Sequence, residues 1–242
     1  MIDKRRDESK SAAGDSDART ERWREHRVAV RAEFVDAAYR ALDKIGADAT
    51  LHDICDEAGA KKPKLYRFFE DKVDLYNAIG DRVVQTLWGR LTGRVDLVQD
   101  SARELIHGCA SEYSAIVTEH PNVFRFMVQG HFAQSPEQAE RSREVGRNYA
   151  ALVAGMAASA LDKRDIDPRL AEFTVIAIFG AVATSTDWWL AINDATPENP
   201  ISNDLFVNQL TAIIVGIAES TLSGNGITVD IDQPLHGAIS FA

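Results

Sequence analysis

Apolar residues recur every three or four positions along most of the chain, and this spacing predicts helices almost throughout residues 21–223. The first helix is expected to end at Ile45, and two short helices follow it. A fourth begins after Asp71 and keeps its apolar positions in helical register as far as Leu91. No strand-like alternation of useful length precedes residue 226. The pattern therefore predicts an all-α protein.

N-caps and prolines divide the rest of the chain. Ser101 and Glu104 have the spacing of a capping box, which predicts a fifth helix from there toward His120. Pro121 interrupts the helical pattern before an aromatic segment. Serine and proline signals then predict three more helices, over residues 135–161, 168–192 and either 200–223 or 202–223.

Residues 50–69 carry the most specific pattern in the chain, that of a helix, a glycine turn and a second helix. Thr50 is a good N-cap, and Asp53 follows it at the spacing of a capping box. Gly59 suits the left-handed conformation that ends a helix, and Pro63 suits the first turn of the next one. The apolar residues that would face inward are Leu51, Ile54, Cys55, Ala58, Leu65, Phe68 and Phe69.

The second helix of this pair is basic. Lys61, Lys62, Lys64 and Arg67 lie at its start and on its outer side. A helix that presents a positively charged N-terminal end to the outside fits the major groove of DNA. The alternative is an ordinary packing unit with a solvated, charged face.

These residues give the chain its resemblance to the TetR family of transcriptional regulators, which extends over residues 27–80. The segment from Phe34 to Gly46, with the small pair Ala37 and Ala38, resembles the first helix of the family. The positions that match the DNA-binding motif of the family are Thr50, Ile54, Ala58, Gly59, Leu65, Tyr66, Phe69 and Lys72.

The resemblance implies a three-helix, N-terminal DNA-binding domain followed by a helical ligand-binding and dimerisation domain. In the family, the residue types found here at Thr50, Tyr66 and Lys72 usually hold phosphates, and the start of the second helix reads bases. The residues assigned to the groove or its walls are therefore Lys61, Lys62, Lys64 and Arg67. Small or hydroxyl residues are commoner in the family at positions 61 and 64, so these lysines should strengthen the attraction to phosphate.

Four segments are expected along the chain. Residues 1–20 are polar and charged without apolar periodicity, which predicts a disordered arm. Its basic residues 4–6 could reach a minor groove, but the acidic residues beside them favour a solvated tail. Residues 21–80 would form the DNA-binding domain and residues 81–223 the helical body. Residues 224–242 would form a tail, for which a short extended segment is one option.

The charge of the chain is unevenly distributed. The formal net charge is −10, yet residues 1–80 hold 16 Lys and Arg against 17 Asp and Glu. Residues 81–242 hold 11 basic and 20 acidic residues. Affinity for DNA must therefore come from a local basic patch, and an acidic body would suppress non-specific binding.

The last two long helices are unusually apolar. The stretch 173–190 is hydrophobic around much of its circumference, so it needs cover on more than one side. Ala212 and Gly216 are small residues one helical turn apart, which allows close helix packing. The resemblance implies a homodimer built on a four-helix interface. The alternative is the core of a monomer.

Aromatic and soft side chains gather in the middle helices, where the resemblance implies a pocket for a small molecule. The candidate lining and anchoring residues are Trp88, His107, Tyr113, Phe124, Met127, Asn148, Tyr149, Met156, Phe173, Thr184, Asp187 and Trp188. The alternative for each aromatic residue is plain core packing. Because no Lys or Arg cluster lies among them, we expect an apolar ligand, such as a fatty acyl or drug-like compound.

Signals for other classes of protein are weak. Glu104 and His107 have the spacing of a di-iron ligand pair, but no second Glu-x-x-His occurs. No phosphate loop or nucleophile motif is present, so neither catalytic residues nor a metal or cofactor site is expected. Cys55 and Cys109 argue against a disulfide framework. With no uninterrupted apolar run of membrane-spanning length and no signal peptide, we expect a cytoplasmic protein.

The sequence thus predicts a ligand-responsive regulator that binds a near-palindromic operator, with repression as the favoured mode. Two alternatives remain at this stage. One is an activator of the same fold, and the other is an all-helical interaction protein that has lost DNA binding.

Overall fold

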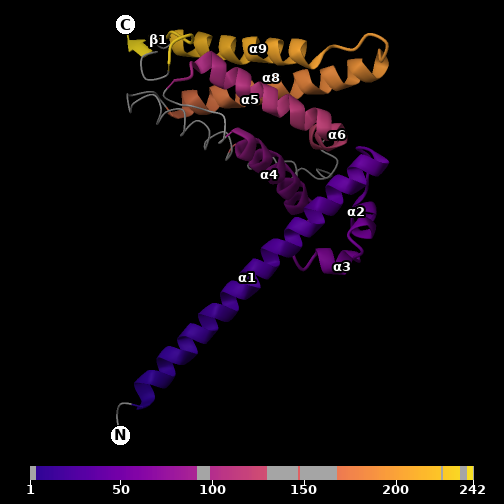
Figure 1. Ribbon diagram of the computed structural model, residues 1–242, viewed down its shortest axis with the longest axis vertical. Coiled ribbons are helices and arrows are strands. Elements are labelled where there is room, and N and C mark those ends of the chain that lie inside the picture. The colour runs from indigo at the N-terminus through magenta and orange to yellow at the C-terminus, as the bar shows by residue number, and fades with distance from the viewer. Residues whose placement is uncertain are drawn as a thin grey trace. The chain divides into compact units, whose positions relative to one another are not determined.

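The computed structural model describes residues 4–91, 99–129, 147, 168–224, 226–234 and 239–241. These residues belong to two compact units, Met1–Ile79 and Gly80–Ala242. The all-α prediction is confirmed, with one short antiparallel strand pair added near the C-terminus (Figure 1). The elements are α1 (Lys4–Ile45), α2 (Leu51–Glu57), α3 (Lys62–Leu65), α4 (Lys72–Leu91), α5 (Ala102–Glu119), α6 (Pro121–Gln129), α8 (Pro168–Ala195), α9 (Asn203–Ser223), β1 (Ile227–Val229) and β2 (Ile239–Phe241).

The first unit consists of α1, α2, α3 and the first two turns of α4. Its core is made of fully buried side chains from all four helices, including Phe34, Ile54, Leu65 and Leu75, together with Phe69 in the segment after α3. The rings of Phe34 and Phe69 meet edge to face, with centroids 5.9 Å apart. Such a pair contributes about 0.5–1.5 kcal/mol beyond the apolar area it buries. This packing fixes the end of the segment after α3 against α1.

The start of α1 differs from the sequence expectation of a disordered arm over residues 1–20. In the structure α1 begins at Lys4 and continues without a break to Ile45. Extending an existing helix costs far less than starting one, because each added residue gains a hydrogen bond without a new nucleus. The segment is polar, but it contains three Ala, three Arg and two Lys, and these residues have high helix propensity.

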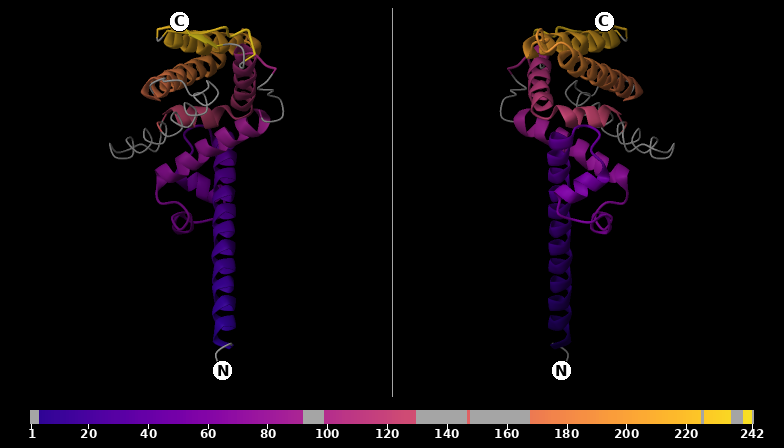
Figure 2. Two further views of the ribbon diagram at one scale, coloured as in Figure 1. Left: turned by 90° about the vertical axis from the view of Figure 1, so that its left-hand side faces the viewer. Right: turned by 90° about the vertical axis from the view of Figure 1, so that its right-hand side faces the viewer.

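The second unit is a helical body in which α5 and α8 both pack against α9 (Figure 2). The rings of Trp189 in α8 and Phe206 in α9 stack with centroids 4.2 Å apart and an interplanar angle of 6°. The indole N–H of Trp189 donates to the carbonyl of Ile201, 3.0 Å away, in the turn that joins the two helices. Stacking and this hydrogen bond hold α8 and α9 as an antiparallel pair.

Local signals set two of the helix starts in this unit. The predicted capping box of Ser101 and Glu104 is present at the start of α5. Ser202, one of the two predicted starts, caps α9 through a hydrogen bond from the backbone N–H of Leu205. The predicted helix over residues 135–161 lies outside the described residues, apart from the helical Arg147.

The C-terminal tail forms an extended segment that attaches to the start of α5. β1 and β2 pair antiparallel, with Thr228 opposite Ser240. Between them, Ile231 is buried and its carbonyl accepts from the backbone N–H of Arg103 at 3.1 Å. The side chain of Arg103 pairs with Asp232 at 2.6 Å. The tail therefore clamps the N-terminal end of α5.

By length and composition alone, two helical stretches, Glu172–Ala195 and Asn203–Ser223, could cross a membrane. Apolar core helices of soluble proteins pass the same test, so this is weak evidence. Only 17% and 28% of their most apolar stretches is buried within the chain. These helices therefore leave a large apolar surface to be covered.

Candidate nucleic-acid interface

The predicted N-cap of α2 is formed by Thr50. The backbone N–H of Asp53 donates to the Thr50 hydroxyl oxygen at 3.4 Å, and the backbone N–H of Thr50 donates to the Asp53 carboxylate at 2.7 Å. The Thr50 hydroxyl also donates to this carboxylate, at 2.6 Å. Hydrogen bonds from the side chain and the backbone of Thr50 lower the pKa of Asp53 below its ordinary value. Thr50 is exposed, and its hydroxyl proton is used within the cap.

The turn between α2 and α3 has the predicted glycine geometry. Gly59 has a φ of +59°, in the left-handed region that other residues reach only at a cost. Pro63 lies in the first turn of α3, where its missing N–H leaves no hydrogen bond unmade. After Leu65 the chain continues in tight turns, in which the N–H of Phe69 donates to the carbonyl of Leu65 at 3.0 Å. We call residues 61–69 the recognition segment.

The recognition segment separates apolar from charged residues. Leu65 and Phe69 are fully buried, and so is Cys55 of α2, where burial raises the pKa of the thiol. All five of the segment's polar candidates for DNA contact are exposed: Lys61, Lys62, Lys64, Tyr66 and Arg67. The arrangement can present four positive charges and a phenol to a nucleic acid groove.

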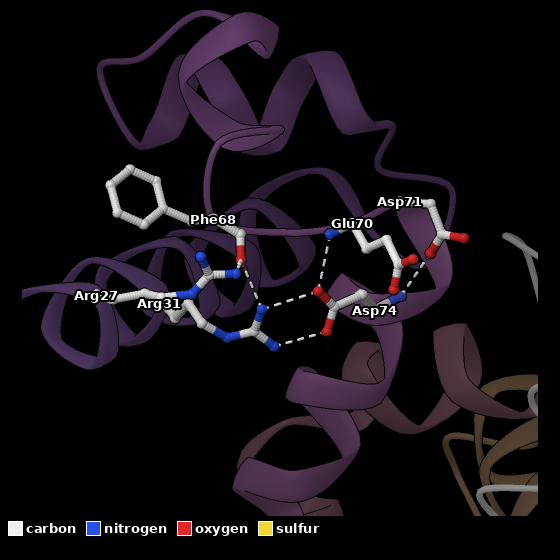
Figure 3. Close-up of polar contacts among 6 residues, drawn as sticks. All are labelled: Arg27, Arg31, Phe68, Glu70, Asp71 and Asp74. Carbon is white, nitrogen blue, oxygen red and sulfur yellow. Dashed lines mark hydrogen bonds and ion pairs between the residues drawn. The ribbon is translucent and has the colours of Figure 1, made fainter. Parts of the chain in front are cut away.

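The last DNA-binding candidate, Lys72, lies in the first turn of α4 and is half-buried. A hydrogen bond from the N–H of Asp74 to the Asp71 side chain, 2.9 Å long, holds this turn. The Asp74 carboxylate accepts from the N–H of Glu70, also at 2.9 Å. The start of α4 is therefore fixed directly after the recognition segment (Figure 3).

Arg31 of α1 connects this turn to the recognition segment. Its two terminal nitrogens donate to the two carboxylate oxygens of Asp74 at 2.7 and 2.8 Å, and one of them also donates to the carbonyl of Phe68 at 2.7 Å. The guanidinium lies 4.3 Å from the ring centroid of Phe69. Arg27, one turn earlier, donates to the same Phe68 carbonyl at 3.3 Å.

The pKa of Asp74 reflects two opposing causes. Partial burial raises the pKa of this carboxyl. The hydrogen bonds from Arg31 and from the N–H of Glu70, with the charges of Arg31 and Arg27, together lower the pKa by more than burial raises it. The net result lies below the ordinary pKa of an aspartate. Sequence reasoning missed this cluster, because Arg31 and Asp74 are 43 positions apart and neither belongs to a local motif.

The predicted ligand candidates of the body fall into separate places. Tyr113 and Phe124 meet edge to face at 5.4 Å, and the hydroxyls of Tyr113 and Thr186 are hydrogen-bonded at 2.8 Å. Burial raises the pKa of Tyr113 to about 12. Met127 is half-buried, with its methyl group against Gly80. These residues form part of the core between α5, α6 and α8.

The other described candidates are exposed within the second unit. They are Trp88, His107, Phe173, Thr184, Asp187 and Trp188. The structure therefore does not gather them around Tyr113. The remaining candidates, Asn148, Tyr149 and Met156, lie outside the described residues. Glu104 is engaged in the cap of α5 through Ser101, which accounts for its position near His107 without a metal ion.

Large apolar side chains are exposed on both α8 and α9. They are Phe173, Ile176, Phe179 and Trp188 in α8 and Leu205 and Ile213 in α9. Gly180 and Thr184 lie among the first group, and Ala212 and Gly216 among the second, and all four are exposed. Large apolar side chains beside small ones allow another helix pair to approach closely. We call this surface the α8–α9 face.

Two family models match the chain. The model described as "Bacterial regulatory proteins, tetR family" matches residues 34–79, which hold the helix-turn-helix. The model described as "Tetracyclin repressor-like, C-terminal domain" matches residues 94–226, more than half of the chain.

Curated relatives agree with these matches. A regulator of Mycobacterium tuberculosis named as an uncharacterized HTH-type transcriptional regulator is 27% identical over 212 residues, which cover 85% of this chain and 86% of the relative. The HTH-type transcriptional activator FasR of Mycolicibacterium smegmatis is 26% identical, with 83% and 86% covered.

A solved structure has a similar fold. The transcriptional regulator FadR of Bacillus subtilis, in complex with stearoyl-CoA, aligns with a TM-score of 0.51 at 16% identity. The alignment covers 76% of this chain and 96% of that one. At this identity the similarity concerns the fold alone.

Proposed function

The chain belongs to the TetR family of bacterial regulatory proteins, and from this premise we propose that it acts in the cytoplasm as a homodimeric repressor that an acyl-type ligand releases from its operator. As a member of this family it is a DNA-binding transcriptional regulator. The dimer, the class of ligand and the direction of the response are the parts that we propose.

The composition and exposure of the recognition segment support the proposed mode of DNA binding. Four exposed basic side chains lie on one short segment of a protein whose net charge is −10. Lys61, Lys62, Lys64 and Arg67 would line the major groove, and Thr50, Tyr66 and Lys72 would hold phosphates. Measuring operator affinity at several salt concentrations tests this assignment. The logarithm of the affinity falls linearly with the logarithm of the salt concentration, and each lost phosphate contact lowers the steepness of this line, the salt slope, by about 0.9.

The α8–α9 face supports the homodimer. Two helices that leave their apolar side exposed lose the stabilisation of burying it, about 25 cal/mol per Å². Pairing with the same face of a second copy covers both surfaces with one symmetric contact. Sedimentation of the protein at micromolar concentration tests this proposal. A monomer under those conditions would refute it.

The acyl ligand is supported by the apolar body and by the neighbouring fold that was crystallised with stearoyl-CoA. The test is a titration of the protein–operator complex with palmitoyl-CoA. Free coenzyme A and a short acyl-CoA serve as controls for the headgroup. Release by the long chain alone supports an acyl ligand, and no release by any of the three contradicts it.

The direction of the response is tested in cells. A reporter placed behind the operator should be silent with the protein present and expressed after its deletion. The opposite result would favour an activator, the activity named for FasR of Mycolicibacterium smegmatis.

A further inference from the structure

Three elements of the first unit meet at a single side chain, Arg31. The two terminal nitrogens of its guanidinium donate hydrogen bonds to both carboxylate oxygens of Asp74 in α4. One of these nitrogens also donates to the carbonyl of Phe68, near the end of the recognition segment (Figure 3). The distances, 2.7 to 2.8 Å, are those of strong, charge-assisted hydrogen bonds. Only a planar guanidinium can make this set, because the ammonium of a lysine lacks the fork.

The two groups that Arg31 joins each lie close to a proposed phosphate contact. Phe68 lies two positions after Tyr66, and Asp74 lies two positions after Lys72. Tyr66 is the C-cap of α3, and Lys72 is the first residue of α4. Without Arg31, only the residues between them would set the distance between Tyr66 and Lys72. A phosphate contact requires its donor to lie within hydrogen-bonding distance of one oxygen. A small change in this separation would therefore cost one of the two contacts.

We propose that Arg31 is a positioning residue for DNA binding, which fixes Tyr66 and Lys72 at the separation that adjacent contacts on the DNA backbone require. This proposal rests on the assignment of those two residues to phosphates. Arg31 acts through Asp74 and the Phe68 carbonyl, and its guanidinium is used within the protein.

The rest of the unit would survive the loss of this link. The first turn of α4 keeps its bond from the N–H of Asp74 to Asp71, and Asp74 still accepts from the N–H of Glu70. The buried pair of Phe34 and Phe69 also remains. Replacing Arg31 by lysine should therefore displace Lys72 without unfolding the domain.

The test uses the full-length protein and a labelled operator duplex, with affinity measured between about 50 and 200 mM salt. Arg31→Lys keeps the net charge, so a simple electrostatic account predicts no change in slope. We expect an affinity about tenfold lower and a salt slope lower by about 0.9, because Lys72 loses its phosphate. Arg40→Lys is the matched control, since Arg40 lies on the same helix and pairs with Glu57 at 2.8 Å. It should change neither quantity.

A second variant separates positioning from charge. Asp74→Asn removes a negative charge close to the DNA surface, which by electrostatics alone would tighten binding. The positioning role predicts weaker binding instead, because a neutral amide cannot accept both donors of Arg31. Tighter or unchanged binding by Asp74→Asn would overturn the proposal, as would a wild-type affinity and slope for Arg31→Lys.

The variant Lys72→Ala separates failure of this inference from failure of the proposed phosphate contacts. It should lower the slope as Arg31→Lys does, and the double variant should lower it no further. If Lys72→Ala leaves the slope unchanged, the phosphate assignment is wrong, and the positioning role falls with it. If Lys72→Ala lowers the slope and Arg31→Lys does not, only the positioning role is wrong.

Discussion

The recognition segment and the α8–α9 face solve two recognition problems with opposite surfaces. The first exposes charge and buries its apolar residues, with Leu65 and Phe69 at no more than 1% exposure. The second exposes large apolar residues, with Phe173 68% and Trp188 56% exposed. These exposures fit the proposal that the first surface binds a polyanion and that the second pairs with another apolar protein face.

The two surfaces should respond differently to salt concentration. Binding through exposed lysines releases counterions from DNA and weakens steeply with salt. Association through apolar area has no such dependence and changes little with salt. The protein should therefore lose its operator over a range of salt in which the proposed dimer persists.

The largest effect is expected from a charge introduced on the α8–α9 face. Ile213→Asp places a charge on the α8–α9 face beside Ala212 and Gly216, and burying two such charges in a symmetric dimer is strongly unfavourable. We expect a monomer. Because a dimer engages two half-sites at once, operator affinity should fall by about 100-fold or more. Sedimentation and operator titration measure the two effects.

The matched control for that variant is His107→Asp, which introduces the same charge at an exposed position on α5. It should leave the dimer intact. If Ile213→Asp stays dimeric, the α8–α9 face is not the interface.

A smaller effect is expected from single substitutions in the recognition segment. Lys62→Ala and Lys64→Ala should each weaken operator binding by about tenfold and lower the salt slope by about 0.9, if each contacts one phosphate. Neither should change the dimer. Lys44→Ala removes the same charge from a lysine that pairs with Glu57 at 2.6 Å, and it should leave the slope unchanged. A slope unaffected by either recognition-segment variant would mean that these lysines lie away from the backbone.

The smallest effect concerns acid stability of the first unit. Asp74 has a folded-state pKa below its unfolded value, so it stabilises the fold above the unfolded pKa of about 4. This contribution is lost as the pH falls through the lower, folded-state pKa. Asp74→Asn should therefore show a shallower loss of stability below pH 4 than the wild type, in denaturant titrations at several pH values. Equal slopes would show that the carboxylate is not held as the structure describes.

Local chemistry made part of this molecule predictable. The two capping boxes join residues three positions apart, Thr50 with Asp53 and Ser101 with Glu104. The conformation of Gly59 concerns its own backbone alone. Their effect on helix ends can be read from spacing alone. The division of the recognition segment into buried Leu65 and exposed lysines followed from helical periodicity for the same reason.

Long-range packing was the part that spacing could not supply. The pair of Arg31 and Asp74 and the stack of Trp189 on Phe206 depend on which helices meet, which no short motif encodes. In α8, apolar residues occur on more than one side, so periodicity could not tell that Trp189 faces the core and Trp188 does not. Phe173 and Trp188, which are among the predicted ligand candidates, are exposed on the α8–α9 face.

We propose that this protein reads DNA as a dimer, through the recognition segments of its two copies. The most direct measurement is to sequence the fragments that the purified full-length protein retains from a random duplex library. A dimer should enrich a near-palindrome whose half-sites lie about one helical turn, or a multiple of it, apart. Enrichment of a single unpaired half-site, or of no sequence at all, would contradict it.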